Sequence, residues 1–381
     1  MKKILFYTAN GVGLGHLRRS CLIAEKIRSE NVKIILVTSA FSPQIFGKFF
    51  DSLIRLIPLS DKLLDSPSKT RKARVKNGQK FTEVIREFKP DIIIADFYLT
   101  SPFTFYTFKH ALDQFPTQCV FIWRLNDNQK FKNNFNNKNH RLDYFQKIIL
   151  PHNPDELKSL LSPLIFKKIK NNKKFSVTGP IFKKIDKNKI DFCRRKYKIC
   201  AKDFLITVGL GGGGELKAGE CESSGKIIKS FLDIYPRLSK EIPKLRAIII
   251  TGPYFSDFKK KSLSRLKFIK FEENFIELVK ISNLAVSTAG YNTCNELIVA
   301  KTPAVLVPLK RGDKEQFERA HYLEKKGIVK IFENKSSNEL LKLILNVKDN
   351  LNKMKLNFKK FSDWKQGDKK TAKIILKAIN G

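Results

Sequence analysis

The sequence predicts an α/β protein made of two similar halves, each with a doubly wound parallel sheet. Short apolar runs rich in isoleucine and valine alternate with helical stretches along most of the 381 residues. Such runs are typical of strands covered on both faces, and their alternation with helices is typical of parallel sheets. A glycine-rich turn follows the first strand of each half, at residues 11–15 and 209–214.

The first half supplies strand candidates at residues 4–8, 33–39, 91–97, 119–123 and 147–150. The segment SVTGPIFKK, residues 176–184, then interrupts the pattern with a Gly-Pro pair. Because this pair disfavours both helix and central strand, we expect a first Rossmann-like domain over residues 1–180.

The second half repeats the pattern, with strand candidates at residues 204–209, 246–251, 267–271, 284–288, 304–308 and 328–332. We expect a second Rossmann-like domain over residues 181–355. Residues 356–381 are expected to form a C-terminal helix that could cross back to the first domain. Ligands of open α/β sheets bind outside the carboxyl ends of the strands, so a cleft between the two domains is the expected site.

The composition limits the classes of function. The net charge is +38, which suits nucleic acid, an anionic membrane or acidic small molecules as partners, but also fits a general compositional bias toward lysine. No apolar run approaches the roughly 18–20 residues of a membrane-spanning helix. The N-terminal apolar run is too short for a signal peptide, so we expect a cytoplasmic protein. The six cysteines form no CxxC pair, and we expect no metal site.

The first glycine turn lies in NGVGLGHLRRS, residues 10–20. Glycines without side chains let a ligand approach the backbone. His16 follows them at a predicted helix start, where the helix dipole favours neutral imidazole. It is a candidate general base or a donor to a diphosphate, and a simple helix cap is the alternative. Arg18 and Arg19 either meet phosphate or are solvated.

The second glycine turn, residues 209–214, is either an anion-binding turn at a helix start or a flexible surface loop. A dinucleotide site would need an acid at the end of the next strand to hold the ribose, and neither half has one. Neither turn ends in the Gly-Lys-Ser/Thr of a P-loop.

The most informative stretch is STAGYNTCNELIVAKTPAVLVPL, residues 287–309. A strand ends at Ser287 and Thr288, Gly290 makes a turn, and Asn292 or Thr293 is expected to cap the next helix. Glu296 then either serves the helix dipole or accepts hydrogen bonds from a ribose diol, with the amides around Gly290 on phosphate.

This stretch, with TPAVLVP and the EQ..RA..LEKKG that follows, resembles the nucleotide-sugar site of family 28 glycosyltransferases. SVTGPIF resembles the interdomain segment of that family, and GLGGGGE its second glycine loop. GVGLGHLRRS is similar to the opening loop of uncharacterised predicted glycosyltransferases with a Gly-x-Gly-His-x-x-Arg motif. The chain also departs from the family, because the usual serine is missing from GLGGGGE and Arg319 replaces an asparagine.

The resemblance implies a GT-B fold whose N-terminal domain binds the acceptor and whose C-terminal domain binds the sugar nucleotide. It implies a metal-independent, inverting transfer of a hexosyl group from a nucleotide-diphosphate sugar, UDP-linked, to an acceptor hydroxyl. The implied donor-binding residues are Gly209, Gly211, Gly212, Gly213, Ser287, Gly290, Thr293, Glu296, Asp313, Gln316 and Arg319. The implied acceptor and diphosphate loop contains Gly11, Gly13, Gly15 and Arg19.

His16 and Asp96 are the expected catalytic residues. Asp96 ends a strand and should point to the ligand. Asp127 is a further candidate base, and the alternative for either aspartate is a solvated or capping role. The basic segments 69–80 and 167–174 are expected as loops that are merely solvated or that meet an anionic lipid surface. That second option would suit a lipid-linked or cell-envelope acceptor and a peripheral position on the inner face of the cytoplasmic membrane.

Two other functions remain open at this point. One is a nucleotide-sugar hydrolase or epimerase of similar build. The other is a basic nucleic-acid-binding protein, which is disfavoured because no nucleic-acid-binding motif is present.

Overall fold

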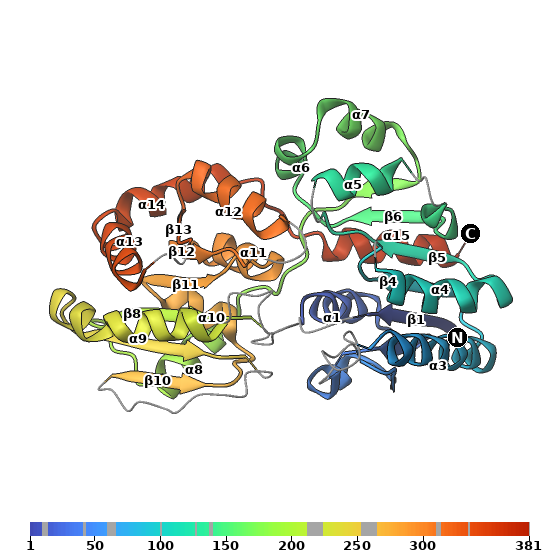
Figure 1. Cartoon of the computed structure of the whole chain (residues 1–381), viewed down its shortest axis with the longest axis horizontal. Coiled ribbons are helices and arrows are strands. Elements are labelled where there is room, and N and C mark those ends of the chain that lie inside the picture. The colour runs from blue at the N-terminus through green and yellow to red at the C-terminus, as the bar shows by residue number, and fades with distance from the viewer. Residues whose placement is uncertain are drawn as a thin grey trace. The chain divides into compact units, whose positions relative to one another are not determined.

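In the computed structural model of this protein, the described residues are 1–9, 14–40, 43–58, 66–99, 101–125, 128–136, 140–211, 224–252, 265–309, 314–333 and 336–380. The chain divides into two compact units (Figure 1). Unit 1 contains Met1–Ile181 and Lys365–Gly381, and unit 2 contains Phe182–Trp364. Each unit has one parallel sheet, which confirms the predicted α/β class.

The sheet of unit 1 has the strand order β3-β2-β1-β4-β5-β6-β7, with every pair parallel. Its strands are β1 (Lys2–Thr8), β2 (Val32–Thr38), β3 (Ser52–Arg55), β4 (Ile92–Asp96), β5 (Cys119–Ile122), β6 (Lys147–Leu150) and β7 (Phe175–Val177). The order reverses between β1 and β4, so the carboxyl ends of these two strands flank the switch point where ligands of such sheets bind. Every predicted strand of this half is present.

Strands β3 and β7 were not predicted. Both lie at the ends of the strand order, and their residues are exposed or half-buried. Since a strand at the edge of a sheet is covered less than a central one, these segments lack the apolar run that identifies the others.

Helices cover both faces of this sheet. They are α1 (Gly15–Ile27), η1 (Pro43–Phe49) and α15 (Asp368–Ile379) on one face, and α3 (Pro67–Phe88), α4 (Pro102–Gln114), α5 (Asn128–Phe135), η2 (Arg141–Tyr144), α6 (Pro154–Leu160) and α7 (Pro163–Asn171) on the other. Alternate residues of β1 enter the two cores: Ile4 and Phe6 face α1, while Leu5 and Tyr7 face α3 and α4. Each such buried side chain contributes roughly 1.5–3 kcal/mol.

The C-terminal segment does not form the single expected helix. Phe358 and Phe361 pack in the core of unit 2, with α11 (Tyr291–Ala300) and α12 (Glu315–Lys326). The helix α15 begins only at Asp368 and packs against α1, and Figure 1 shows this red helix within the blue-to-green unit. Gly367 donates its amide N–H to Pro180 O (2.8 Å) and lies against the backbone of Gly179, whose φ is +97°.

The sheet of unit 2 has the order β10-β9-β8-β11-β12-β13, again all parallel, and its switch point lies between β8 and β11. Its strands are β8 (Phe204–Gly209), β9 (Leu245–Ile250), β10 (Leu266–Ile269), β11 (Leu284–Thr288), β12 (Ala304–Val307) and β13 (Val329–Ile331). All strands predicted in this half are present.

The helices of unit 2 also pack on both faces of its sheet. They are α8 (Lys187–Tyr197), α9 (Ser224–Glu241), α10 (Phe275–Ile281), α11 (Tyr291–Ala300), α12 (Glu315–Lys326), α13 (Ser337–Asp349), α14 (Leu351–Asn357) and η3 (Phe358–Phe361).

The two basic segments that we expected as loops are largely helical. Residues 69–80 lie inside α3, and residues 167–171 are the last turns of α7. The expectation failed because lysine and arginine are good helix formers, and buried residues at helical spacing, such as Ala73, Asn77 and Phe81 in α3, fix these segments to the core.

The contact between Gly367 and Gly179 makes a stability prediction. A Cβ atom at position 367 would overlap the carbonyl oxygen of Gly179. We expect Gly367→Ala to lower the free energy of unfolding by about 1–3 kcal/mol, measured by urea denaturation. Gly47→Ala is the matched control, because nothing lies within 4 Å of a Cβ there. Equal stability of the two variants would contradict the packing described at this point.

Candidate active site

The first candidate site lies at the switch point of unit 1. Helix α1 begins at Gly15, after the glycine-rich segment that follows β1, and a hydrogen bond between Thr8 Oγ1 and Ser20 Oγ (2.8 Å) ties the helix to the end of that strand. His16 and Arg19 lie in the first turns of α1, and both are buried. Asp96, the last residue of β4, is fully buried beside them.

These three side chains form one hydrogen-bonded cluster. Arg19 donates from Nε to Asp96 Oδ2 (2.8 Å) and from Nη2 to Asp96 Oδ1 (2.6 Å). His16 Nδ1 lies 2.6 Å from Asp96 Oδ1 and 3.1 Å from Arg19 Nη2. The structure thus brings together the two residues that we expected to be catalytic.

The contacts of His16 Nδ1 favour one tautomer. An ionised carboxylate only accepts hydrogen bonds, and Asp96 Oδ1 lies closer to Nδ1 (2.6 Å) than the donor Arg19 Nη2 does (3.1 Å), so we place the proton on Nδ1, pointing to Asp96. The neutral ring then has its lone pair on Nε2. This atom is buried and has no hydrogen-bond partner among the described residues. A buried acceptor left without a partner costs about 1–3 kcal/mol, so a hydrogen bond donated to this lone pair would be favourable.

Burial and charge set both protonation states. Burial lowers the pKa of His16 below its ordinary value; Asp96 opposes this change, while Arg19 and Arg124 add to it. For Asp96, burial raises the pKa, but Arg19 and His16 outweigh this effect, so that its pKa is lowered. The site at neutral pH therefore holds a neutral imidazole next to an ionised carboxylate, which is the state that a general base requires.

We expected Arg19 to contact phosphate or solvent. Instead its side chain is 1% exposed and donates two hydrogen bonds to Asp96. Gly15 is the first residue of α1. The remaining residues proposed for this edge, Gly11, Gly13 and Asp127, lie outside the described residues.

Two residues beside His16 were missed in the sequence. The ring of Tyr98 meets the imidazole edge-on, with centroids 4.9 Å apart, and Arg124 Nη2 donates to the Tyr98 hydroxyl (2.6 Å). Each residue stands two positions after a strand end, Tyr98 after β4 and Arg124 after β5. That position at the carboxyl edge was the signal that could have identified them.

The second candidate site lies at the switch point of unit 2. Ser287 Oγ donates to Gly209 O (2.5 Å), which joins the ends of β11 and β8. Gly211 follows with φ +67°, a conformation that favours glycine, and its Cβ position faces Thr288 Oγ1 at 3.8 Å. The structure therefore brings together Gly209, Gly211 and Ser287 as expected, whereas Gly212 and Gly213 lie outside the described residues.

Helix α11 starts at this edge with an unusual cap. Its N-cap residue is Gly290, which has no side chain that could cap the helix. The expected capping by Asn292 or Thr293 is therefore wrong. The first turn of the helix contains no acidic side chain, and Glu296 is buried one turn further on. An N-terminus with the glycine at the cap presents backbone N–H groups and a positive dipole end, which suits an anion.

Helix α12 supports the same turn through a buried ion pair. Arg319 Nη1 donates to Ala289 O (3.0 Å), Nη2 donates to Glu315 (2.6 Å), and the guanidinium lies over the ring of Tyr291. Gln316 accepts a hydrogen bond from Leu309 N (3.1 Å) through Oε1. Arg319 thus holds the turn before α11. The role of Glu315 was missed in the sequence, where only its i,i+4 spacing to Arg319 pointed to it. Asp313 lies outside the described residues.

The part of the chain that the structure describes contains no group of three or more His, Cys, Asp or Glu arranged to hold a metal ion. Among the described helices, none combines the length and the hydropathy that crossing a bilayer requires.

The lowered pKa of His16 predicts how stability depends on pH. The unfolded chain protonates this histidine below about pH 6.5, whereas the folded protein keeps it neutral to lower pH. The unfolded state therefore binds more protons as the pH falls, and the free energy of unfolding decreases by up to about 1.4 kcal/mol per pH unit. Asp96 stays ionised in this range because its pKa is lowered.

Urea denaturation at pH 7.5 and 5.5 measures this dependence. We expect His16→Gln to reduce the loss of stability between the two pH values. His321→Gln, which replaces an exposed histidine, is the control and should leave the loss unchanged. An identical loss in His16→Gln and the original protein would show that this histidine is not held neutral by the fold.

Comparison with known proteins finds similarity to one family over part of the chain. The glycosyltransferase family 28 C-terminal domain model matches residues 222–374. The UDP-N-acetylglucosamine–N-acetylmuramyl-(pentapeptide) pyrophosphoryl-undecaprenol N-acetylglucosamine transferase of Borreliella burgdorferi is 29% identical over 173 residues. That match covers 44% of this chain and 44% of the relative, so less than half of the relative is spanned.

Solved structures match over nearly the whole chain. The glycotransferase of kitacinnamycin aligns with a TM-score of 0.66 at 11% identity and covers 99% of this chain and 98% of that one. A putative UDP-N-acetylglucosamine 2-epimerase from Listeria monocytogenes aligns with a TM-score of 0.61 at 11% identity, covering 98% and 94%. Acinetobacter baumannii MurG aligns with a TM-score of 0.58 at 14% identity, covering 99% and 100%. At these identities the likeness concerns the fold. The chain therefore has the GT-B fold, and its residues 222–374 are similar to the C-terminal domain of glycosyltransferase family 28.

Proposed function

We propose that this protein is an inverting glycosyltransferase, which moves a hexosyl group from a UDP-linked sugar to a hydroxyl group of a lipid-linked acceptor. Unit 2 binds the sugar nucleotide and unit 1 binds the acceptor. The donor and acceptor classes are supported by the Borreliella relative, whose name contains a UDP-sugar and an undecaprenol-linked acceptor.

The observation that carries the proposal is the neutral imidazole of His16, with its Nδ1 proton held by Asp96 and its Nε2 without a described partner. In the proposed reaction, Nε2 takes the proton from the acceptor hydroxyl while the oxygen attacks the anomeric carbon. The bond from that carbon to the diphosphate oxygen breaks, and its electron pair leaves with the nucleoside diphosphate. A single displacement of this kind inverts the configuration at the anomeric carbon.

Unit 2 supplies the groups that this leaving diphosphate needs. The backbone amides at the start of α11 and the turn at Gly209 and Gly211 stabilise the charge that develops on the diphosphate. We assign the ribose hydroxyls to Glu296 and the diphosphate to the turn at Gly290 and Thr293. The carbonyl oxygen of Gln316 is already used by Leu309, so its contact with the donor sugar would come from the amide nitrogen.

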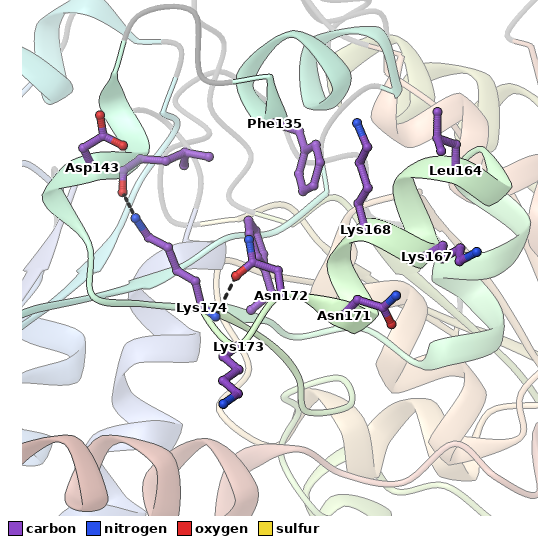
Figure 2. A pocket seen from close by; sticks show the side chains of 11 residues that line it. Phe135, Asp143, Leu164, Lys167, Lys168, Asn171, Asn172, Lys173 and Lys174 are labelled. Carbon is purple, nitrogen blue, oxygen red and sulfur yellow. Dashed lines mark hydrogen bonds between the residues drawn. The ribbon is translucent and has the colours of Figure 1, made fainter.

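A lipid-linked acceptor would lie at a membrane surface, so unit 1 needs a surface that can contact one. A cavity of about 840 Å³ in unit 1 is bordered by Lys167, Lys168, Lys173 and Lys174. In Figure 2 their ammonium groups spread in different directions around the cavity instead of converging on one point. Leu164, on the same helix as Lys168, is 64% exposed. An exposed apolar side chain among spread lysines suits a flat anionic surface, so we propose peripheral contact with the inner face of the cytoplasmic membrane.

A donor-binding experiment tests the assignment to unit 2. We expect UDP and UDP-sugars to raise the melting temperature of the protein, because a ligand that binds only the folded state stabilises it. Glu296→Gln should weaken UDP binding roughly tenfold or more, since a hydrogen-bonded charge contributes about 1.5–3 kcal/mol. Glu324→Gln, a change of the same charge on α12, is the control.

Three outcomes contradict the proposal. Absence of any shift with nucleotides counts against the donor site, and unchanged UDP affinity in Glu296→Gln counts against the assigned residue. Consumption of a UDP-sugar without an acceptor, at the full turnover rate, would instead favour a hydrolase or an epimerase.

A vesicle-binding experiment tests the membrane contact. Each lysine near an anionic surface contributes about 1 kcal/mol, so neutralising Lys168 and Lys173 by glutamine should lower partition to anionic vesicles by about 30-fold. The control is Lys353→Gln with Lys359→Gln, which removes the same charge from unit 2. A second matched pair is Leu164→Ala and Leu356→Ala, since these leucines are 64% and 62% exposed. Equal effects of the two lysine pairs would show that net charge alone attracts the protein to the vesicles. Equal effects of the two leucine variants would contradict a membrane contact through Leu164.

A further inference from the structure

We propose that Tyr98 and Arg124 form a positioning pair, which holds the imidazole of His16 in place and opposes its protonation. The inference rests on the proposed function in one respect, the role of His16 as the base. Neither residue belongs to the motifs that carry the family resemblance.

The contact with His16 is made by the ring of Tyr98. The two rings stand at an interplanar angle of 76°, with centroids 4.9 Å apart, which is the edge-to-face arrangement that aromatic rings favour. Asp96 fixes one side of the imidazole through Nδ1, at 2.6 Å. The ring of Tyr98 packs on the imidazole as a second support, so its rotation is restricted by two neighbours from the end of the same strand, β4.

Arg124 in turn fixes Tyr98. Its Nη2 donates to the phenol hydroxyl at 2.6 Å, and its guanidinium carbon lies 5.4 Å from the centroid of the tyrosine ring. The tyrosine is therefore held by both its ring and its hydroxyl. Arg124 and Tyr98 are half-buried, so water screens these contacts less than it would at the surface.

The pair also acts on the charge of His16. Arginine is always protonated, and the ring of Tyr98 already meets this permanent cation. A second cation at His16, on the same ring, would be repelled by the first. The other charged groups facing the imidazole are Arg19, which also opposes its protonation, and Asp96, which favours it. Burial is the largest cause of the lowered pKa of His16. Asp96 opposes this change, and the two arginines, Arg19 and Arg124, add to it.

The test follows the titration of His16 by NMR in the full chain labelled with ¹⁵N-histidine, and it needs no substrate. The signal is assigned by its loss in His16→Asn. We expect His16 in the original protein to titrate below the ordinary range for histidine, and its midpoint to move upward in Arg124→Met. Tyr98→Phe keeps the ring but loses the hydroxyl that Arg124 binds, and should move the midpoint in the same direction by less.

Arg74→Met is the matched control, because Arg74 also lies over a tyrosine of unit 1, Tyr106, at 4.5 Å, and is not among the groups that shift His16. An unchanged midpoint in a folded Arg124→Met, or an equal change in Arg74→Met, would overturn the proposal. If transfer activity is found, the acid limb of the kcat/KM profile should move upward in Arg124→Met. The titration stands without that activity, so failure of the proposed function and failure of this inference are distinguishable.

Discussion

The buried pair of Arg19 and Asp96 is the interaction on which the candidate site of unit 1 depends. A carboxylate with no exposed surface is stable as an anion only if it is paired and fully hydrogen-bonded, and Arg19 provides two such bonds in a fixed geometry. The same carboxylate also forms a hydrogen bond with His16 Nδ1. The protonated nitrogen of the imidazole, the direction of Nε2 and the neutral state of the ring all follow from this arrangement.

The two candidate sites are built from different groups. At the switch point of unit 1, the side chains of His16, Arg19 and Asp96 form the site, and the ends of α1 and β4 hold them. At the switch point of unit 2, backbone amides form the site, at Gly209, Gly211 and the N-terminus of α11. The buried ion pair of Glu315 and Arg319 stabilises the turn before α11 through the carbonyl oxygen of Ala289. In the proposed reaction, a proton is moved at the first site and a negative charge is stabilised at the second, and the two kinds of group match these two tasks.

Much of this fold could be predicted from the sequence, since central strands of parallel sheets are continuous apolar runs. The edge strands β3 and β7 lack such runs, and the break before α15 depends on a glycine contact between residues 179 and 367 that no local pattern reveals. Asp96 could be identified because it ends a strand, and His16 because it follows a glycine turn at a predicted helix start. That Arg19 binds Asp96 could not, because 77 positions separate the two in the chain and only the parallel pairing of β1 with β4 brings them together. The contact between Tyr98 and Arg124 could not be predicted either, although each residue stands two positions after a strand end.

The tautomer of His16 is the quantity that tests this account most directly. Nitrogen-15 chemical shifts of the imidazole, measured at neutral pH on the full chain, distinguish a protonated nitrogen from one with a free lone pair. The account predicts a neutral ring with the proton on Nδ1, bonded to Asp96, and a lone pair on Nε2. A ring with its proton on Nε2, or a doubly protonated ring at neutral pH, would contradict it, because neither form could accept a proton from an acceptor hydroxyl at that atom.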